Sequence, residues 1–325
     1  ILLAPLNEQQ RIADEIEAQY SRLNTWLEVM QKLHEQLPRL RASILKAAVE
    51  GRLVSQDPHD EPGVVLLQRV LDERRRRWEY DYLANLTAQG KSAPKDDKWK
   101  EKYPEPLPPD TDDLPNLPDG WTWAAIEQVG EVRLGRQRSP DKRSKDYPTK
   151  YIRAANITEQ GLDLSDVLEM EFTPEEREIY RLRINDILVS EASGSPDQVG
   201  KSAIWNDEIE DCCFQNTVIR LRAPHIDSRY LLIVLKHFYQ SGVMARTAGG
   251  VGINHLSASR FARLPVPLAP EKQQAAIVNE VNAKLSLIDR LEETIRVNVK
   301  RAERMRQSIL KQAFEGRLVE QNPDD

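Results

Sequence analysis

Apolar residues recur every three or four positions in two long stretches, one near each end of the chain. Such steps place the side chains on one stripe of a helix, which is typical of a helix that docks along another helix. Each stretch predicts one helix of about 45 residues, roughly 65–70 Å long at the rise of an α-helix. The stripe positions are Ile12, Ile16, Tyr20, Leu23, Leu27, Met30, Leu33, Leu37, Leu40, Ile44 and Ala48 in the first stretch, and Ile277, Val281, Leu285, Ile288, Leu291, Ile295, Val299, Ala302, Met305, Ile309 and Ala313 in the second.

The two stretches are copies of one segment, because a shift of 265 residues places 3–58 on 268–323 without a gap. Two unrelated amphipathic helices are the simpler interpretation of either stripe alone, but they would not share one register over this length. The closest matches are Leu3-Ala4-Pro5 with Leu268-Ala269-Pro270, Ser43–Lys46 with Ser308–Lys311, and Glu50–Val54 with Glu315–Val319. Two equal helices around one globular unit are expected to pair antiparallel as a stiff spacer.

Local signals mark the ends of both helices. Pro270 suits a first helical turn, and Gly51 and Gly316 stand where a left-handed C-terminal cap is expected. Pro38 lies inside the first helix and predicts a kink there, because it removes one backbone hydrogen bond.

The region between the helices divides into a connector and a domain. Residues 53–114 contain a predicted helix over 63–87 and a Pro-rich linker over 88–114. Four consecutive arginines, Arg74–Arg77, lie on that helix, and a solvated face is a simpler interpretation than a phosphate contact. From Leu117-Pro-Asp-Gly-Trp121 to about 267, short apolar strands alternate with Gly and Pro, and one helix interrupts them near 228–241.

These patterns predict an α+β protein, in which a strand-rich mixed α/β domain is flanked by two long helices that form an antiparallel coiled coil. The expected boundaries are 1–52 for the first helix, 53–114 for the connector, 115–267 for the domain and 268–325 for the second helix.

Composition narrows the classes of function. The 325 residues carry a formal net charge of −6, so DNA binding would need local basic patches on an acidic background. The sequence has neither an apolar run of about 20 residues nor a signal peptide. Cys212 and Cys213 are adjacent and suit neither a disulfide nor a metal clamp, which favours a reducing, cytoplasmic compartment.

One basic stretch stands out in a domain that is otherwise near neutral. Residues 133–153 hold eight Lys and Arg against Asp141 and Asp146. Bases of this kind contact phosphates, whereas forked or amide side chains read base edges, although a solvated loop explains the stretch as well. The candidate DNA-binding residues are Arg136, Gln137, Arg138, Ser139, Lys142, Arg143, Asn156, Ser193, Gln198, Lys201, Gln215, Asn216, Thr247 and Asn254. A structural hydrogen bond is the alternative role for each Gln, Asn or Ser.

The sequence gives no candidate for catalysis, and none for cofactor or metal binding. Residues 194–202 nearly spell a phosphate-binding loop, but the spacing is off by one and the residues after Lys201 resemble a strand, whereas such a loop leads into a helix. No Asn/Asp-Pro-Pro-aromatic motif of an adenine methyltransferase is present. Asp96-Asp97-Lys98 falls in the linker, and the five histidines are scattered without ligand spacing.

The chain resembles the DNA specificity subunits (HsdS) of type I restriction-modification enzymes. The resemblance lies in the helix entries Leu3–Ile12 and Leu264–Ile277, the helix exit Ser308–Val319, and the domain start Leu117–Trp121. It includes Asn185-Asp186-Ile187-Leu188, where the family usually has Gly in place of Asn185. The match covers nearly the whole chain except 60–114.

The resemblance implies a target-recognition domain that reads one half of a bipartite site in double-stranded DNA. It implies that the helix pair is a spacer on which adenine methyltransferase subunits dock, joined by a motor-nuclease subunit, with no catalysis in this chain. The family order of domain, helix, domain, helix implies a first recognition domain before Ile1. Both a fragment of a two-domain subunit and a half-length chain that pairs with a second copy fit the sequence. The alternative function is a coiled-coil scaffold whose central domain binds protein without DNA.

Overall fold

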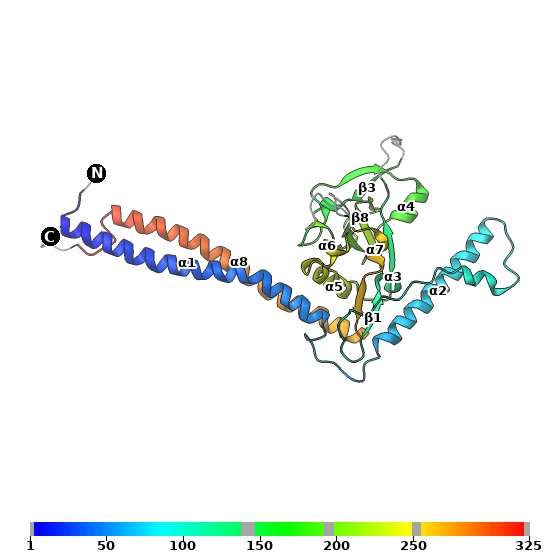
Figure 1. Ribbon diagram of the computed structural model, residues 1–325. Coiled ribbons are helices and arrows are strands. Elements are labelled where there is room, and N and C mark those ends of the chain that lie inside the picture. The colour runs from blue at the N-terminus through cyan, green and yellow to red at the C-terminus, as the bar shows by residue number, and fades with distance from the viewer. Residues whose placement is uncertain (1–2, 138–146, 192–197, 249–254, 322–325) are drawn as a thin grey trace. The chain divides into compact units, whose positions relative to one another are not determined.

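The computed structural model describes residues 3–137, 147–191, 198–248 and 255–321. Packing divides the chain into two units, unit 1 with Ile1–Ile44 and Asn282–Asp325, and unit 2 with Leu45–Val281. This division cuts both long helices, α1 (Leu6–Val49) and α8 (Glu271–Phe314), each of which contributes residues to both units (Figure 1). The boundaries at 52, 114 and 267 remain predictions.

Unit 1 is an antiparallel pair of helices, as the repeated apolar stripe predicted. Gln321 contacts Glu8, Arg306 contacts Tyr20, and Asp289 contacts Arg41, so residue numbers fall along α8 as they rise along α1. Buried side chains in this unit recur every seven residues in α8, at Ile288, Ile295, Ala302 and Ile309. Seven-residue spacing of buried apolar side chains is the hallmark of a coiled coil. Pro38 lies inside α1, which continues to Val49.

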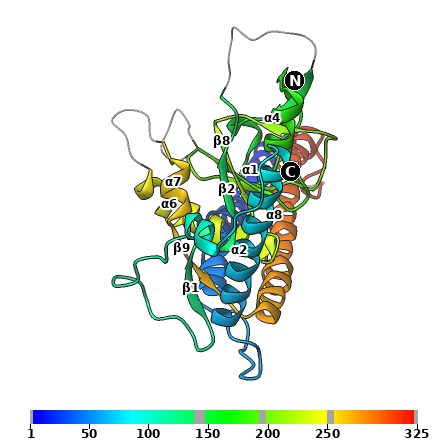
Figure 2. The same ribbon diagram turned by 90° about the vertical axis from the view of Figure 1, so that its right-hand side faces the viewer.

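The connector of unit 2 contains α2 (Gly63–Ala88) and a short 3-10 helix, η1 (Asp97–Lys102). Arg74 of the arginine run donates to the backbone oxygen of Gly130 at 3.1 Å. Helix α2 contacts β1 (Thr122–Ala125), β9 (Pro265–Leu268) and α3 (Ile126–Val129). Figure 2 labels α2 together with β1 and β9. The other three arginines form ion pairs with acids on α2 itself. Arg75, Arg76 and Arg77 therefore lie on an exposed face of α2, as the simpler interpretation had it, whereas Arg74 joins α2 to the domain.

The domain of unit 2 contains three small sheets. Strands β1 and β9 pair antiparallel, and the larger sheet has the antiparallel order β2-β8-β5-β6. The third sheet has the order β4-β3-β7, in which β3 and β7 are parallel. The strands not yet given are β2 (Glu131–Leu134), β3 (Pro148–Ile152), β4 (Leu168–Glu171), β5 (Ile187–Ser190), β6 (Ser202–Ile204), β7 (Cys213–Phe214) and β8 (Val218–Arg222).

Short helices complete the domain. They are η2 (Ala154–Asn156), α4 (Pro174–Tyr180), α5 (Ser228–Gln240), α6 (Val243–Thr247) and α7 (Ala258–Ala262). The helix predicted near 228–241 is α5, and a strand follows Lys201 as predicted.

One core joins the two larger sheets. Ile152 of β3 and Phe214 of β7 pack with Leu188 of β5 and Val218 of β8. Their strand neighbours Tyr151 and Cys213 belong to a separate core cluster, because successive strand residues point to opposite faces. In the described ranges, no helix is both long and apolar enough to cross a membrane.

Candidate functional site

Several loops of the domain meet at the turn Gln215–Thr217, between β7 and β8. The backbone N–H of Asn216 donates to the oxygen of Arg136 at 3.0 Å, where the chain leaves β2. The N–H of Glu191 donates to the oxygen of Thr217 at 2.9 Å, where the chain leaves β5. The hydroxyl of Thr217 accepts from the N–H of Ala154, just after β3. Three segments that are far apart in sequence therefore end beside one turn.

Two further segments reach the same place. The N–H of Ser190 donates to the oxygen of Lys201 at 2.9 Å, and its hydroxyl donates to the oxygen of Gln198 at 2.8 Å. The N–H of Leu256 donates to the oxygen of Glu191 at 2.9 Å. We call this set the rim; it comprises Arg136–Gln137, Arg153–Asn156, Glu191, Gln198–Lys201, Gln215–Thr217 and His255–Leu256.

The rim brings together five of the predicted DNA-binding residues with surface-accessible side chains. Gln137 is exposed, and Gln198, Lys201, Gln215 and Asn216 are half-buried. Lys201 donates its ammonium to the side-chain oxygen of Gln198, which orients both groups. Amide and ammonium groups of this kind suit contacts to base edges and phosphates.

Arg136 was expected in an exposed basic loop, and the structure corrects this expectation. The residue is buried, with 9% of its surface exposed. Its Nε lies 2.8 Å from Oε1 of Glu176 in α4, and its guanidinium lies 5.3 Å from the ring centre of Phe172. The side chain therefore holds α4 against the end of β2.

Asn156 was also expected to face DNA, but its side chain is used within its own loop. Its Nδ2 donates to the backbone oxygens of Asp163 and Asp166, and its Oδ1 accepts from the N–H of Arg153. Only 2% of its surface is exposed. The residue shapes the loop that carries Arg153 at the rim.

Thr247 is another of the predicted DNA-binding residues, and the structure places it in the last turn of α6. Its hydroxyl donates to the oxygen of Val243 at 2.9 Å, one helical turn earlier. Gly200 lets α6 approach the rim, since a Cβ at Gly200 would lie 2.4 Å from the Cβ of Met244. The φ of Gly200 is +88°, a conformation that favours glycine.

Six predicted residues lie outside the described residues: Arg138, Ser139, Lys142, Arg143, Ser193 and Asn254. Their segments, 138–146, 192–197 and 249–254, each join the rim at one end or both through Gln137, Glu191, Gln198 or His255. Segment 138–146 carries four bases and two acids in its sequence.

His255 and Arg153 also lie at the rim, although neither is a candidate from the sequence. His255 was counted among scattered histidines, but its Nδ1 lies 3.3 Å from the carboxylate of Glu191. Arg153 closes the basic stretch and forms an ion pair with Asp166. The basic stretch was the available signal for Arg153; for His255 no signal exists in the sequence, because its partner is 64 residues away.

Buried ion pairs fix the sheet that carries the rim. Asp186 accepts two hydrogen bonds of 2.7 Å from Arg222 and one from the N–H of Arg183. Arg220 lies 2.9 Å from Glu131. Burial lowers the pKa of Arg220 to about 10. Burial opposes a fall in the pKa of Glu131, but the nearby arginines, Arg220 foremost, outweigh it and lower that pKa. Strand β8 is thereby tied to its neighbour β2 and to Asp186, next to β5.

A second site is formed where the repeated helix ends meet the domain. We call residues Leu45–Gly51 and Leu268–Val281 the occupied seat. The indole N–H of Trp121 donates to the side-chain oxygen of Gln273 at 2.8 Å. A Cβ at Gly51 would lie 2.5 Å from Cγ of Pro118. The turn 117–121, predicted as the start of the domain, is thus the part that rests on the helix ends.

The repeat gives unit 1 a matching set, Leu3–Ile16 and Leu310–Gly316, which we call the free seat. Three of its apolar residues are exposed where their counterparts are buried. The pairs are Leu3 at 84% and Leu268 at 0%, Leu310 at 41% and Leu45 at 2%, and Phe314 at 85% and Val49 at 7%.

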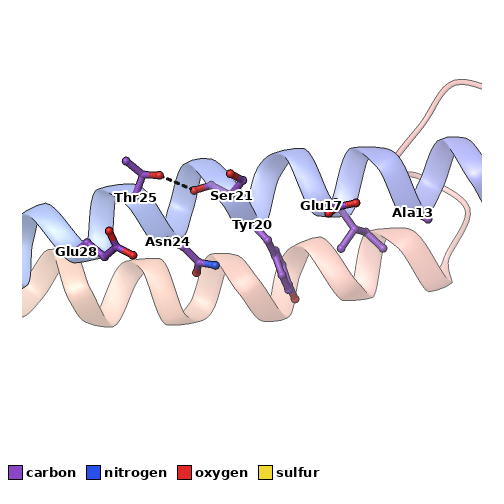
Figure 3. Close-up of a pocket in the computed structure, with 8 residues that line it drawn as sticks. Ala13, Glu17, Tyr20, Ser21, Asn24, Thr25 and Glu28 are labelled. Atoms are coloured by element: carbon purple, nitrogen blue, oxygen red, sulfur yellow. Dashed lines mark hydrogen bonds between the residues drawn. The ribbon is translucent and has the colours of Figure 1, made fainter.

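A shallow groove of about 690 Å³ adjoins the free seat and includes Ala13 and Ile16. Their counterparts in the second copy, Val278 and Val281, are almost fully buried. Figure 3 shows Tyr20 and Asn24 of this groove directed toward α8, where Tyr20 donates to the backbone oxygen of Arg306. In the described ranges, no group of three or more His, Cys, Asp or Glu is placed to hold a metal.

Comparison with known proteins gives one consistent result. A family model described as "Type I restriction modification DNA specificity domain" matches residues 118–301. The EcoEI specificity subunit of Escherichia coli is 25% identical over 306 residues, which cover 89% of this chain and 47% of that protein. The EcoAI specificity subunit of the same species is 25% identical over 304 residues, which cover 91% of this chain and 47% of that protein. The chain therefore spans about half the length of these curated relatives.

A solved structure supports the fold. The HsdS subunit from Thermoanaerobacter tengcongensis superposes with a TM-score of 0.54 at 17% identity, over 97% of this chain and 60% of that one. At this identity the likeness is one of fold.

Proposed function

The chain belongs to the type I restriction-modification DNA specificity family, and from this premise we propose that its domain reads one half of a bipartite DNA site through the rim. The helix pair of unit 1 acts as a spacer and as the dock for adenine methyltransferase subunits. A motor-nuclease subunit joins this cytoplasmic assembly for cleavage. Methylation and cleavage reside in these partners, and the chain itself supplies specificity.

The observation that carries the proposal is the convergence of loops at the rim. Gln137, Gln198, Lys201 and Asn216 offer amide and ammonium groups at one end of the sheet. The segment 138–146 attaches there through Gln137 and adds four bases. Amides suit base edges, whereas bases supply the salt-dependent phosphate contacts.

The test is DNA selection with the partner methyltransferase present, since one small domain makes few contacts by itself. We expect a short defined half-site. Replacing Arg138, Lys142 and Arg143 together by Gln should weaken binding and reduce the slope of log K against log salt by about 2–3. The control is the same replacement at Arg75, Arg76 and Arg77, which removes equal charge from ion pairs on α2.

An unchanged DNA affinity and salt slope in the 138/142/143 variant, or the absence of any sequence preference with the partner added, would contradict the proposal. Either result would favour the scaffold function, in which the domain binds protein and DNA plays no part.

The free seat supports a second part of the proposal: it accepts another recognition domain, supplied by a second copy of the chain. Its exposed Leu3 and Phe314 correspond to Leu268 and Val49, which are buried at the occupied seat. Sedimentation velocity of the full chain should show a concentration-dependent dimer. Replacing Phe314 by Ser should abolish the dimer, whereas replacing Tyr80 of α2, which is 72% exposed against 85% for Phe314, by Ser should leave it intact.

A further inference from the structure

An acidic side chain lies at the rim, where the proposed function expects contact with DNA. Among the rim residues, all of which belong to the described ranges, Glu191 alone carries a carboxylate. Phosphates repel such a group. A carboxylate on a surface that binds DNA therefore has to face the edges of bases instead of the backbone.

The backbone of Glu191 is held on both sides. Its N–H donates to the oxygen of Thr217, and its oxygen accepts from the N–H of Leu256, each at 2.9 Å. The residue directly follows β5, in which all four residues are buried. These bonds fix the place from which the side chain starts, and they remain when the side chain is replaced.

The carboxylate of Glu191 lies beside His255 and can accept further hydrogen bonds. Nδ1 of His255 lies 3.3 Å from Oε1 and 3.4 Å from Oε2. A carboxylate has about four acceptor sites, so a donor from DNA can bind without displacing His255. Both side chains reach the surface, with 14% of the Glu191 side chain and 49% of the His255 side chain exposed.

The contact between these two side chains adds little to the fold. The backbone bond from Leu256 to Glu191 already joins the same two segments. A pair with one partner half exposed contributes little stability of its own. What the contact does supply is a fixed direction for the carboxylate.

Duplex DNA offers few donors to a carboxylate. In the major groove they are the amino groups at N4 of cytosine and N6 of adenine. Adenine also presents the acceptor N7 beside N6, which repels a carboxylate and suits an amide side chain such as that of Gln. Cytosine presents its amino group without such an acceptor, so it is the base that a carboxylate recognises best.

We propose that Glu191 reads a cytosine of the half-site by accepting a hydrogen bond from its amino group, and that His255 is the positioning residue that directs the carboxylate. This inference rests on the proposed reading of a half-site through the rim. It assigns one base of the target to one residue of the chain.

The test is DNA selection by the full chain with the partner methyltransferase present. The parent chain should prefer cytosine at one position of the half-site. Glu191→Gln should lower the ratio of cytosine to adenine at that position alone by about tenfold, because an amide accepts from N6 and donates to N7 of adenine. His255→Gln should lower the same ratio by a smaller factor and leave the other positions unchanged, which loss of a merely structural contact would not do.

The matched control is Glu210→Gln, which removes the same charge from an exposed residue in the loop after β6. That loop leaves the sheet at the end away from the rim, since Ile204 pairs with Ile187 at the start of β5, whereas Ser202 pairs with Val189 next to the rim. Glu210→Gln should leave the preference at every position unchanged.

A base analogue isolates the hydrogen bond itself. When 2-pyrimidinone replaces the selected cytosine, the DNA lacks only the amino group. This replacement should weaken binding of the parent chain by about tenfold and should leave the affinity of Glu191→Ala unchanged.

The outcomes separate this inference from the proposed function. A parent chain that selects no half-site overturns the proposed function and, with it, the role of Glu191. A defined half-site with the same preferences in Glu191→Gln and the parent, or with every position weakened equally, overturns the reading of cytosine and leaves the proposed function standing. An equal loss on the analogue in Glu191→Ala and the parent has the same meaning.

Discussion

The guanidinium of Arg41 lies 2.7 Å from the carboxylate of Asp289 across the helix pair of unit 1. The 265-residue shift places Arg41 on Arg306 and Asn24 on Asp289. Arg306 does donate to the side-chain oxygen of Asn24. One contact is therefore made twice, once from each helix. Two antiparallel copies of one segment are expected to pair in this way, with local twofold symmetry.

This symmetry predicts opposite effects for two substitutions. Asn24→Asp should stabilise the helix pair by about 0.5 kcal/mol, because it turns the second contact into an ion pair, and Asp289→Asn should destabilise it by a similar amount. Urea denaturation of the full chain measures both. Thr25→Asp adds the same charge one position along, where the hydroxyl bonds to Ser21 on its own helix, and should bring no gain.

The two capping glycines should differ in their tolerance of Ala. At a φ of +66° an L-residue costs about 1–2 kcal/mol. Gly316→Ala should show this cost alone, since Gln321 lies 3.5 Å from the added methyl group. Gly51→Ala should lower stability further, because Pro118 lies 2.5 Å from that position. Calorimetry that gave equal losses for the two variants would contradict the close packing of the domain turn on Gly51.

Substitutions at Asn185 and Asp186 should change the stability of the domain in opposite directions. Asn185 has a φ of 70°, so Asn185→Gly should stabilise the domain by about 0.5–1 kcal/mol. Asp186 is 1% exposed and bonds to Arg222 twice, so Asp186→Ala should cost about 3–5 kcal/mol by leaving that arginine without its partner. Chemical denaturation tests both, and a loss under 1 kcal/mol for Asp186→Ala would show that the ion pair contributes little.

Stability of unit 2 should fall in mild acid because of His237 on α5. Burial lowers the pKa of His237 below its ordinary 6.5, with Glu50 opposing the shift and Lys46 adding to it. The unfolded chain therefore takes up a proton at a higher pH than the folded chain does. The contribution of His237 to the free energy of unfolding is therefore fully present above about pH 6.5. It is lost as the pH drops from there through the lower, folded-state pKa.

His237→Gln should make the free energy of unfolding less dependent on pH between about pH 6.5 and 5. The same substitution at the exposed His225 should leave that pH dependence unchanged. Denaturation midpoints across this range give the comparison. A parent chain with the same pH dependence as His237→Gln would remove this residue as the cause.

Cys212 and Cys213 should resist alkylation until the domain unfolds. Both are free and buried, and burial raises the pKa of each thiol to about 12. The thiolate is the reactive form, so almost none is present at neutral pH. Iodoacetamide labelling should be slow in buffer and fast in urea; equally fast labelling in both would indicate that β7 opens readily.

The amino-acid sequence by itself determined the helix pair, its antiparallel arrangement and the place of the domain between the helices. Periodicity is read from neighbouring residues, and a repeat is found by comparing the sequence with itself. The capping glycines and the stripe Ile288, Ile295, Ala302 and Ile309 can therefore be identified without knowing which residues they contact. The same holds for the motif around Asp186, where a left-handed backbone at Asn185 explains the glycine usual in the family.

Only the tertiary structure decided which polar residues face outward at the rim. Arg136, Gln137 and Asn156 are similar candidates in sequence, yet Glu176 and Phe172 bury the first, and Asp163 and Asp166 engage the third. Their partners lie between 7 and 40 residues away or across a sheet, and no local pattern encodes such pairings. The two seats show the same limit. The repeat identifies equivalent helix ends, but the residues that lie against them, Trp121 and Gln321, come from unrelated segments that meet only through folding.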